Sequence, residues 1–134
     1  MDIPKGTMVA VADGETLRLF RNDGDAGSPS LTGLPKVKVD DDNMGSGGRH
    51  QSSSANPSDS QQNEDAFAAG IAALLNKQVL DHKVQKLIVI AAPRTLGELR
   101  KHYHKTLSAI LLGEISKDLT GHDTADIERS IAAA

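Results

Sequence analysis

Residues 86–102 read KLIVIAAPRTLGELRKH and join an apolar run directly to an amphipathic one. Residues 87–92 are apolar at successive positions, which predicts that residues 86–92 form a strand buried on both faces, as in a parallel sheet. Thr95 and Glu98 match a capping box with Thr95 as the N-cap. A helical stripe then follows, made of Leu96, Leu99 and Tyr103. This strand–helix unit predicts an α/β fold.

Two β-rich runs lie near the start of the chain, at residues 7–12 (TMVAVA) and 16–21 (TLRLFR). The dipeptide Asp13-Gly14 between them predicts a hairpin, because Asp and Gly tolerate positive φ at both central turn positions. Residues 36–40 (KVKVD) alternate between polar and apolar and predict a third antiparallel strand. Residues 22–35 are rich in Gly, Pro, Asn and Asp, and we expect a loop there.

The rest of the chain predicts mainly helices. Residues 64–80 carry a helical stripe of Phe67, Ile71, Leu74, Leu75 and Gln78. Residues 107–119 are ambiguous, because Leu and Ile spaced by four favour a helix while the alternation in AILLGEI favours a strand. Asp123 or Thr124 can cap a short helix carrying Ile127 and Ile131. Three antiparallel strands followed by alternating helices and strands indicate a ribonuclease H-like mixed sheet with packed helices.

Composition limits the classes of protein that this chain can be. Its 134 residues predict a single domain covering residues 1–134. The formal net charge of −3 gives no overall attraction to nucleic acid, so a basic surface must be local. There is no cysteine, which excludes disulfides, zinc knuckles and a cysteine nucleophile. Two Phe, one Tyr and no Trp argue against modules that stack bases on aromatic platforms.

The N-terminal residues MDIPKGTMVAVADG contain no apolar run of signal-peptide length. The longest fully apolar stretch, residues 87–93, is far too short to span a bilayer. We therefore expect a cytoplasmic protein with no membrane association.

Three long stretches resemble one known family. GTMVAVADGETLRLFRNDGD, LIVIAAPRTLGELRKHYHK and GEISKDLTGHDTADIERSI are similar to the bacterial host-attachment protein family, whose members carry the name "protein required for attachment to host cells". The likeness covers nearly the whole chain, and APRTLGELRKH is its most specific part. It implies that residues 111–117 form a strand, against the four-residue spacing.

That family is similar in turn to the middle domain of archaeal and eukaryotic class 1 peptide release factors. The release-factor domain carries a Gly-Gly-Gln loop between its third strand and its long first helix. Here Gly47, Gly48, Arg49, His50 and Gln51 stand at the matching place, within a polar stretch that predicts a flexible loop over residues 41–63. The resemblance implies an extended arm that orders against a partner.

The motif departs from the release-factor pattern in one respect. The family places Gln directly after the second Gly, whereas Arg49 and His50 separate Gly48 from Gln51 in this chain. This displacement puts a hydrolytic role of Gln51 in doubt. A disordered polar insertion, with no function of its own, is the competing interpretation of the whole loop.

Basic and anion-binding residues follow the predicted buried strand. The helix start at Arg94 and Thr95 could bind an anion through free backbone N–H groups of Leu96 and Gly97. A dense basic cluster comes next, which could bind RNA or an acidic partner; the candidate residues are Arg100, Lys101 and His104. The alternative is an ordinary capped helix with a solvated basic face.

Neither a metal site nor a cofactor site is predicted. A ribonuclease H-type nuclease needs acids on the first strand, first helix and fourth strand, but the fourth strand ends in Ala91-Ala92-Pro93. His102 and His104 are two residues apart, which on a helix places them on nearly opposite faces. No nucleophile-elbow pattern accompanies the serines.

We therefore expect a host-attachment family protein that acts indirectly from the cytoplasm as a non-catalytic, ribosome- or RNA-associated binding domain. Its contacts would be Gly47, Gly48, Arg49 and His50 together with the surface from Arg94 to Lys105. The alternative is a peptidyl-tRNA hydrolase or release-factor-like enzyme that uses Gln51. A surface adhesin is disfavoured by the N-terminal sequence. The oligomeric state stays open.

Overall fold

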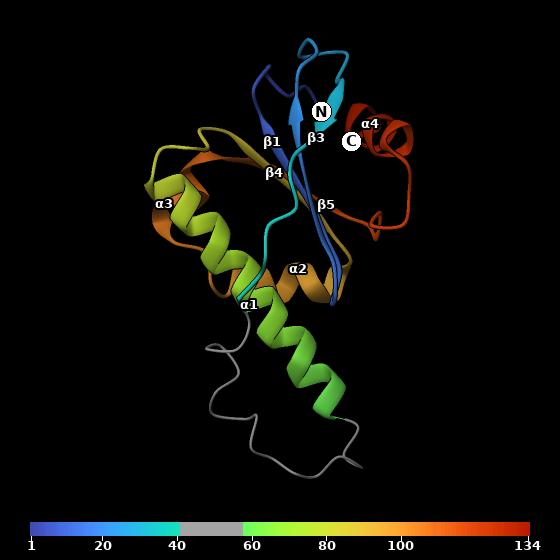
Figure 1. Cartoon of the computed structure of the whole chain (residues 1–134). Helices are drawn as coiled ribbons and strands as arrows, with labels where there is room; N and C mark the ends of the chain where they lie inside the picture. Colours follow the sequence, from blue (N-terminus) through green and yellow to red (C-terminus); the bar gives the residue numbers. More distant parts are fainter. Residues whose placement is uncertain (41–57) are drawn as a thin grey trace.

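The computed structural model describes residues 1–40 and 58–134. Five strands form one mixed sheet in the order β3-β2-β1-β4-β5 (Figure 1). Their bounds are β1 Met8–Ala12, β2 Leu17–Asn22, β3 Leu31–Gly33, β4 Leu87–Ala91 and β5 Leu111–Ser116. β1, β2 and β3 pair antiparallel, whereas β4 lies parallel to β1 and β5. This topology confirms the predicted α/β fold with a ribonuclease H-like mixed sheet.

Strand β4, which lies between β1 and β5, contributes side chains to both layers of the core. All five of its side chains are buried, as the apolar run predicts. Leu87 and Val89 face one cluster, while Ile88 and Ile90 face the other. The first layer is covered by α1 (Ser58–Leu80), α2 (Pro93–Arg100) and α3 (Lys105–Ile110), and the second by α4 (Thr124–Ala133) (Figure 1). No helix in these two described stretches is long and apolar enough to span a bilayer.

The third strand is not the one that the alternating residues predict. Residues 36–40 lie outside the sheet, and β3 forms instead at Leu31–Gly33, within the predicted loop. Leu31 is buried in the second core layer, and its backbone N–H donates to the Glu128 carboxylate of α4 (2.7 Å). Val39 packs against the first layer, so the chain leaves the sheet plane after Leu34. Tertiary packing overrides the local preference of these residues for a strand.

The β1–β2 hairpin is where the Asp-Gly dipeptide predicts it, but its turn has another mechanism. Neither Asp13 nor Gly14 has positive φ. The Asp13 carboxylate accepts hydrogen bonds from the backbone N–H groups of Glu15 (2.8 Å) and Thr16 (2.6 Å). The side chain therefore holds the turn by an Asx-type contact, and no left-handed backbone is required.

Two predicted helix starts are also wrong. α1 begins at Ser58, so residues 58–63 belong to the helix and not to the predicted loop. In α2 the N-cap is Ala92, and Thr95 is a buried residue in the first turn, because Pro93 at the first helical position brings a preset φ and no N–H. By contrast, the Asp123 cap of α4 is confirmed, since its carboxylate accepts from the N–H of Asp126 (2.9 Å).

Residues 107–119 hold both of the structures that the pattern allows. α3 ends at Ile110 and β5 begins at Leu111. The strand that the family resemblance implies over residues 111–117 is thus confirmed. The four-residue spacing of Leu and Ile misleads here because Leu107 and Ile115 face opposite core layers.

Candidate functional site

Several segments meet where β1 and β4 end. The Glu64 side chain of α1 covers the β1–β2 turn so closely that a Cβ on Gly14 would lie 2.7 Å from its carboxyl group. The Thr120 hydroxyl, beyond β5, donates to the Asp13 carboxylate (2.8 Å). α2 starts directly after β4 at the same end (Figure 1). The carboxyl ends of parallel strands are where α/β proteins commonly place their sites.

Residues 41–57 connect to this end through α1. The backbone carbonyl of Asp40 and the Val39 side chain press on α1 at Gly70, where an added Cβ would lie 2.8 Å from each. The other end of the segment joins α1 at Ser58. With a rise of about 1.5 Å per residue, the two attachment points are about 18 Å apart along one helix. The predicted loop residues Gly47, Gly48, Arg49, His50 and Gln51 lie outside the described residues.

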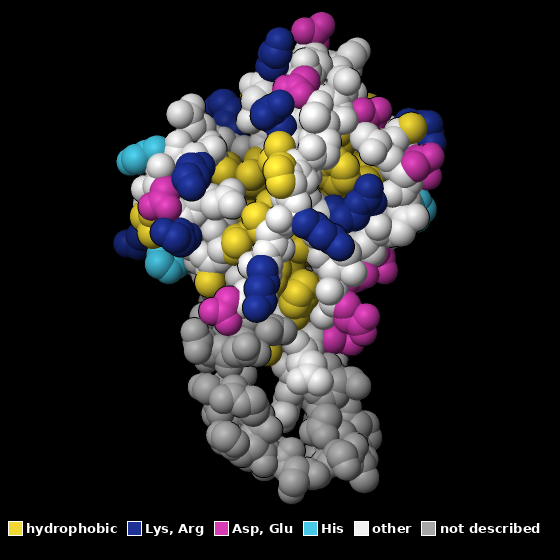
Figure 2. Space-filling model, viewed as in Figure 1, with side chains coloured by type: hydrophobic (Ala, Val, Ile, Leu, Met, Phe, Trp, Pro, Cys, Tyr) yellow, Lys and Arg dark blue, Asp and Glu magenta, His cyan; other side chains and the backbone are white. Residues whose placement is uncertain are grey.

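The chain leading to Asp40 is basic. Lys36 and Lys38 are exposed and take part in none of the ion pairs among the described residues. Figure 2 shows lysine and arginine side chains gathered over this face of the molecule, on and around the segment that leaves β3. This local concentration of positive charge contrasts with the net charge of −3 of the whole chain.

The predicted anion site at the start of α2 is only partly formed. Arg94 is exposed, but Thr95 is buried, and the N–H of Leu96 donates within the helix to the Ala92 carbonyl (2.9 Å). The predicted outward N–H of Leu96 is therefore wrong. The start of α2 therefore contributes only the exposed side chain of Arg94, which lies just beyond the carboxyl end of β4.

The predicted basic cluster is largely paired with acids. Arg100 forms a salt bridge with Glu114 on β5 (2.8 Å), which raises the pKa of the guanidinium. Lys101 and His102 both contact the Glu98 carboxylate, at 3.1 and 3.4 Å. Burial raises the pKa of Glu98, but hydrogen bonds from these two neighbours outweigh burial and leave the pKa lowered. The cluster is thus split into two groups, and a glutamate lies beside the basic side chains of each group.

Glu114 was not among the candidate residues, yet it organises this region. Its carboxylate accepts from Arg100 and from the hydroxyl of the half-buried Tyr103 (3.3 Å). Burial and the adjacent Glu114 charge raise the pKa of Tyr103. The sequence carries no local signal for this role, because residues 100 and 114 lie far apart in the chain and meet only in the folded structure.

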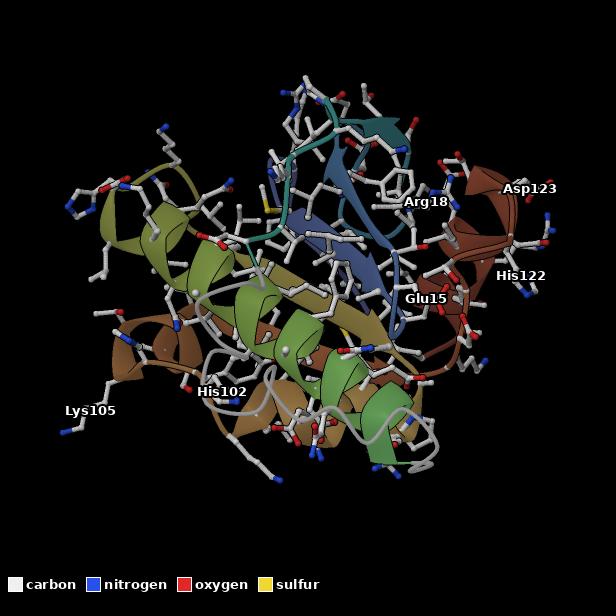
Figure 3. The ribbon with its side chains drawn as sticks, turned by 60° about the horizontal axis from the view of Figure 1, so that its bottom comes forward. Glu15, Arg18, His102, Lys105, His122 and Asp123 are labelled. Carbon is white, nitrogen blue, oxygen red and sulfur yellow. The ribbon has the colours of Figure 1, made fainter. Side chains whose placement is uncertain are left out.

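A pocket of about 440 Å³ lies beside the second half of α1. Asn76, which is only 5% exposed, forms part of its wall and ties α1 to the link between α2 and α3. Its side-chain amide donates to the His102 carbonyl (2.9 Å) and accepts from the His104 N–H (3.0 Å). The pocket is lined by Ala69, Ala73, Asn76, Lys77, Leu80, Asp81, His102 and His104. The side chain of His102 is seen near this link in Figure 3.

The structure therefore separates the predicted residues. His104 lines the pocket, Arg94 stands at the end of the sheet, and Arg100 and Lys101 are held by acids. Asn76 was missed, although a polar residue next to the apolar stripe of a predicted helix was the available signal. Within residues 1–40 and 58–134, no three His, Asp or Glu side chains come together as metal ligands.

Comparison with known proteins gives two matches. A protein of Rickettsia prowazekii (strain Madrid E), named "Uncharacterized protein RP470", is 39% identical over 51 residues, which is 38% of this chain and 34% of that protein. The aligned part thus spans about a third of that relative. Residues 6–131 match the family described as bacterial archaeo-eukaryotic release factor family 12. The description confirms the release-factor likeness and does not include the host-attachment name, which stays a prediction. The chain belongs to bacterial archaeo-eukaryotic release factor family 12.

Proposed function

We propose that this chain is a release-factor-like domain that binds the ribosome or its RNA without catalysing a reaction. The observation that carries the proposal is the family match together with the position of Gly47 and Gly48 between β3 and α1. This is the place where the middle domain of release factors carries its functional loop. Binding in the cytoplasm, and any indirect influence on host attachment, are part of the proposal.

The charges near the loop attachment favour an anionic partner. Lys36 and Lys38 lead directly into the segment, and Arg94 stands exposed at the end of the sheet. Lysine and arginine contacts to phosphate supply most of the sequence-independent affinity for nucleic acid. Together with Arg49 and His50, these residues would form a basic surface that contacts the phosphates of an RNA.

Sedimentation with ribosomes tests this proposal. We expect the protein to pellet with ribosomes at low salt and to be released at high salt, because phosphate contacts are lost to counterions. Arg49→Ala and the double change Lys36→Ala with Lys38→Ala should each weaken pelleting. Lys83→Ala is the matched control, since Lys83 is an exposed lysine just beyond the opposite end of α1. Protein that stays at the top of the gradient at low salt would show that the proposal is wrong.

The family description also favours a second candidate, hydrolysis of peptidyl-tRNA. Gln51 is the residue available for it, although Arg49 and His50 separate it from the glycines. If the activity exists and uses this residue, hydrolysis should depend on Gln51 and Gly48. A hydrolysis rate that is unchanged in Gln51→Ala would remove Gln51 from the mechanism.

A further inference from the structure

The chain contains two Asp-Gly dipeptides, Asp13-Gly14 and Asp23-Gly24. Such a dipeptide can rearrange spontaneously, because glycine has no side chain to hinder its backbone nitrogen. That nitrogen attacks the protonated side-chain carboxyl group of the aspartate and forms a cyclic imide, while the amide proton and the carboxyl hydroxyl leave together as water. A second water molecule then adds to the main-chain carbonyl of the imide and breaks its bond to nitrogen. The product is an isoaspartate, whose main chain runs through the former side chain.

The Asp13-Gly14 dipeptide has its reacting groups in one small ring. The Asp13 carboxylate accepts from the N–H of Glu15 (2.8 Å), and the ring closed by this hydrogen bond contains the Gly14 nitrogen. Within the part of the chain that the structure describes, no hydrogen bond engages the Gly14 N–H. Asp13 and Gly14 are also only half-buried, so water can reach them. The nitrogen is therefore available for attack on the neighbouring carboxyl group.

The Asp23-Gly24 dipeptide is blocked at both reacting groups. The Gly24 N–H donates to the side-chain oxygen of the fully buried Asn22 (2.9 Å). The Asp23 carboxylate accepts from the Arg21 guanidinium (2.9 Å) and from the Thr32 hydroxyl. The hydrogen bond from Arg21 lowers the pKa of Asp23, so the protonated form that must lose water is scarcer. Gly24 is tightly enclosed as well, since an added Cβ would lie 2.5 Å from a backbone carbonyl oxygen.

A residue near the other end of the chain restrains Asp13. The Thr120 hydroxyl donates to one carboxylate oxygen of Asp13 (2.8 Å). The N–H groups of Glu15 and Thr16 donate to the other oxygen. Closure of the imide ring must expel one of these oxygens as water. Expulsion of the oxygen bound by Thr120 breaks one of these hydrogen bonds, whereas expulsion of the other breaks two. The Thr120 hydroxyl is therefore the contact that most directly limits the reaction.

We propose that Asp13-Gly14 is a site of isoaspartate formation in the folded chain, that Asp23-Gly24 is not, and that the Thr120 hydroxyl slows the reaction. The modification would insert one methylene carbon into the main chain at the β1–β2 turn. It would also remove the contact between the Asp13 side chain and Thr120, and so loosen the hairpin from the chain that leads to α4. This inference goes beyond the proposed function and does not depend on ribosome binding.

Peptide mapping of the aged full chain tests the proposal. Trypsin releases residues 6–18 and 22–36, which hold one Asp-Gly dipeptide each. Electron-transfer fragmentation in a mass spectrometer then distinguishes isoaspartate from aspartate. Relative to a fresh sample, isoaspartate should accumulate at least about fivefold faster at Asp13 than at Asp23, because only the second site must first break the hydrogen bond of its glycine N–H. In urea the two sites should react at similar rates, because the folded contacts are lost.

Three results would overturn the proposal. One is the absence of isoaspartate at Asp13 in the aged, folded chain. Another is a rate at Asp23 that equals or exceeds the rate at Asp13. The last is a difference between the two sites that persists in urea, since the fold would then not be its cause.

Thr120→Val tests the role of the hydroxyl, because valine keeps the branched shape of threonine without the donor. Isoaspartate at Asp13 should form about three to ten times faster in this variant, since a part-buried hydrogen bond to the carboxylate is lost. Thr120→Ser, which retains the hydroxyl, should react at the parent rate. Thr106→Val, at an exposed position of α3, is the matched control. An unchanged rate in folded Thr120→Val would overturn the role of Thr120. The comparison of the two dipeptides in the parent chain requires no variant.

Discussion

The two faces of the sheet are covered in different ways. On one face, α1, α2 and α3 pack with polar connections between them, such as the Asn76 amide bridge, and residues 41–57 attach there. On the other face, the covering residues are aliphatic, and α4 contributes Ile127 and Ile131, both fully buried. We therefore expect a partner to bind on the three-helix face, whereas the α4 face serves mainly to stabilise the fold.

Even the polar contacts on the α4 face serve to hold the chain together. Arg18 lies over the Phe20 ring at 5.0 Å and donates to the carbonyls of Thr120 and His122 (3.0 and 2.7 Å). Figure 3 shows the Arg18 side chain between β2 and the chain around α4. Its guanidinium therefore fixes the loop before α4 to the hairpin. Four substitutions test the contrast between the two faces.

The largest effect is expected from Ile127→Ala on the α4 face. Removing a fully buried isoleucine side chain should lower the free energy of unfolding by about 2–5 kcal/mol. Urea denaturation measures this loss. The folded variant should bind ribosomes as the parent chain does. Impaired binding by folded Ile127→Ala would contradict the division of roles between the faces.

Asn76→Ala should have the next largest effect. It leaves the His102 carbonyl and the His104 N–H without their partner, which should cost about 1–3 kcal/mol in total, because both hydrogen bonds are only part-buried. Gln78→Ala on the same helix is the control, with a change of unfolding free energy within about 0.5 kcal/mol. Asn76→Ala with parent stability would mean that the amide bridge is not structural.

Gly70→Ala addresses the contact between α1 and the chain before residue 41. Alanine favours the helix by about 1 kcal/mol, but its Cβ would lie 2.8 Å from the Asp40 carbonyl. We expect the helix gain to be offset and residues 36–40 to be displaced, so that trypsin cleaves faster at Lys36 and Lys38. Gly97→Ala in α2 is the control, because nothing lies within 4 Å of its added Cβ. Equal cleavage rates in both variants would show that Gly70 does not fix this segment.

The smallest effect is expected at Glu98, whose pKa lies below its ordinary value of 4.5. Its charged form therefore stabilises the fold above pH 4.5, and this contribution is lost as the pH falls through the lowered pKa. Glu98→Gln should destabilise by at most about 1 kcal/mol at pH 7, since Lys101 is exposed. The difference from the parent should shrink on acidification to about pH 3. Unfolding measurements on Glu15→Gln, in the β1–β2 turn, provide the control. A difference that grows on acidification would reverse the inferred direction.

The fold was predictable where neighbouring residues in the sequence are enough to determine the local structure. β4 is apolar throughout and Asp123 caps α4, so local physics and tertiary packing agree there. The alternating residues 36–40 favour a strand locally, but Leu31 has the better partners in Glu128 and the second core layer. The alternation of polar and apolar residues does not by itself determine which of two neighbouring segments pairs with β2.

The candidate site was predictable only in part. Lysines, arginines and histidines can be found in a sequence, but their partners cannot. Glu114 on β5 meets Arg100 at the end of α2 only in the folded structure, and Asn76 meets His104 because α1 lies beside the link between α2 and α3. The roles of Gly47, Gly48, Arg49, His50 and Gln51 stay predictions.

The hydrogen bond between Leu31 and Glu128 has a consequence for synthesis on the ribosome. It joins residues 97 positions apart and occupies a backbone donor on the outermost strand of the sheet. A nascent chain would display that strand edge, open to pairing with neighbouring chains, until the segment around Glu128 has emerged. We therefore expect the last helix, once formed, to protect the start of this edge strand from pairing with another chain.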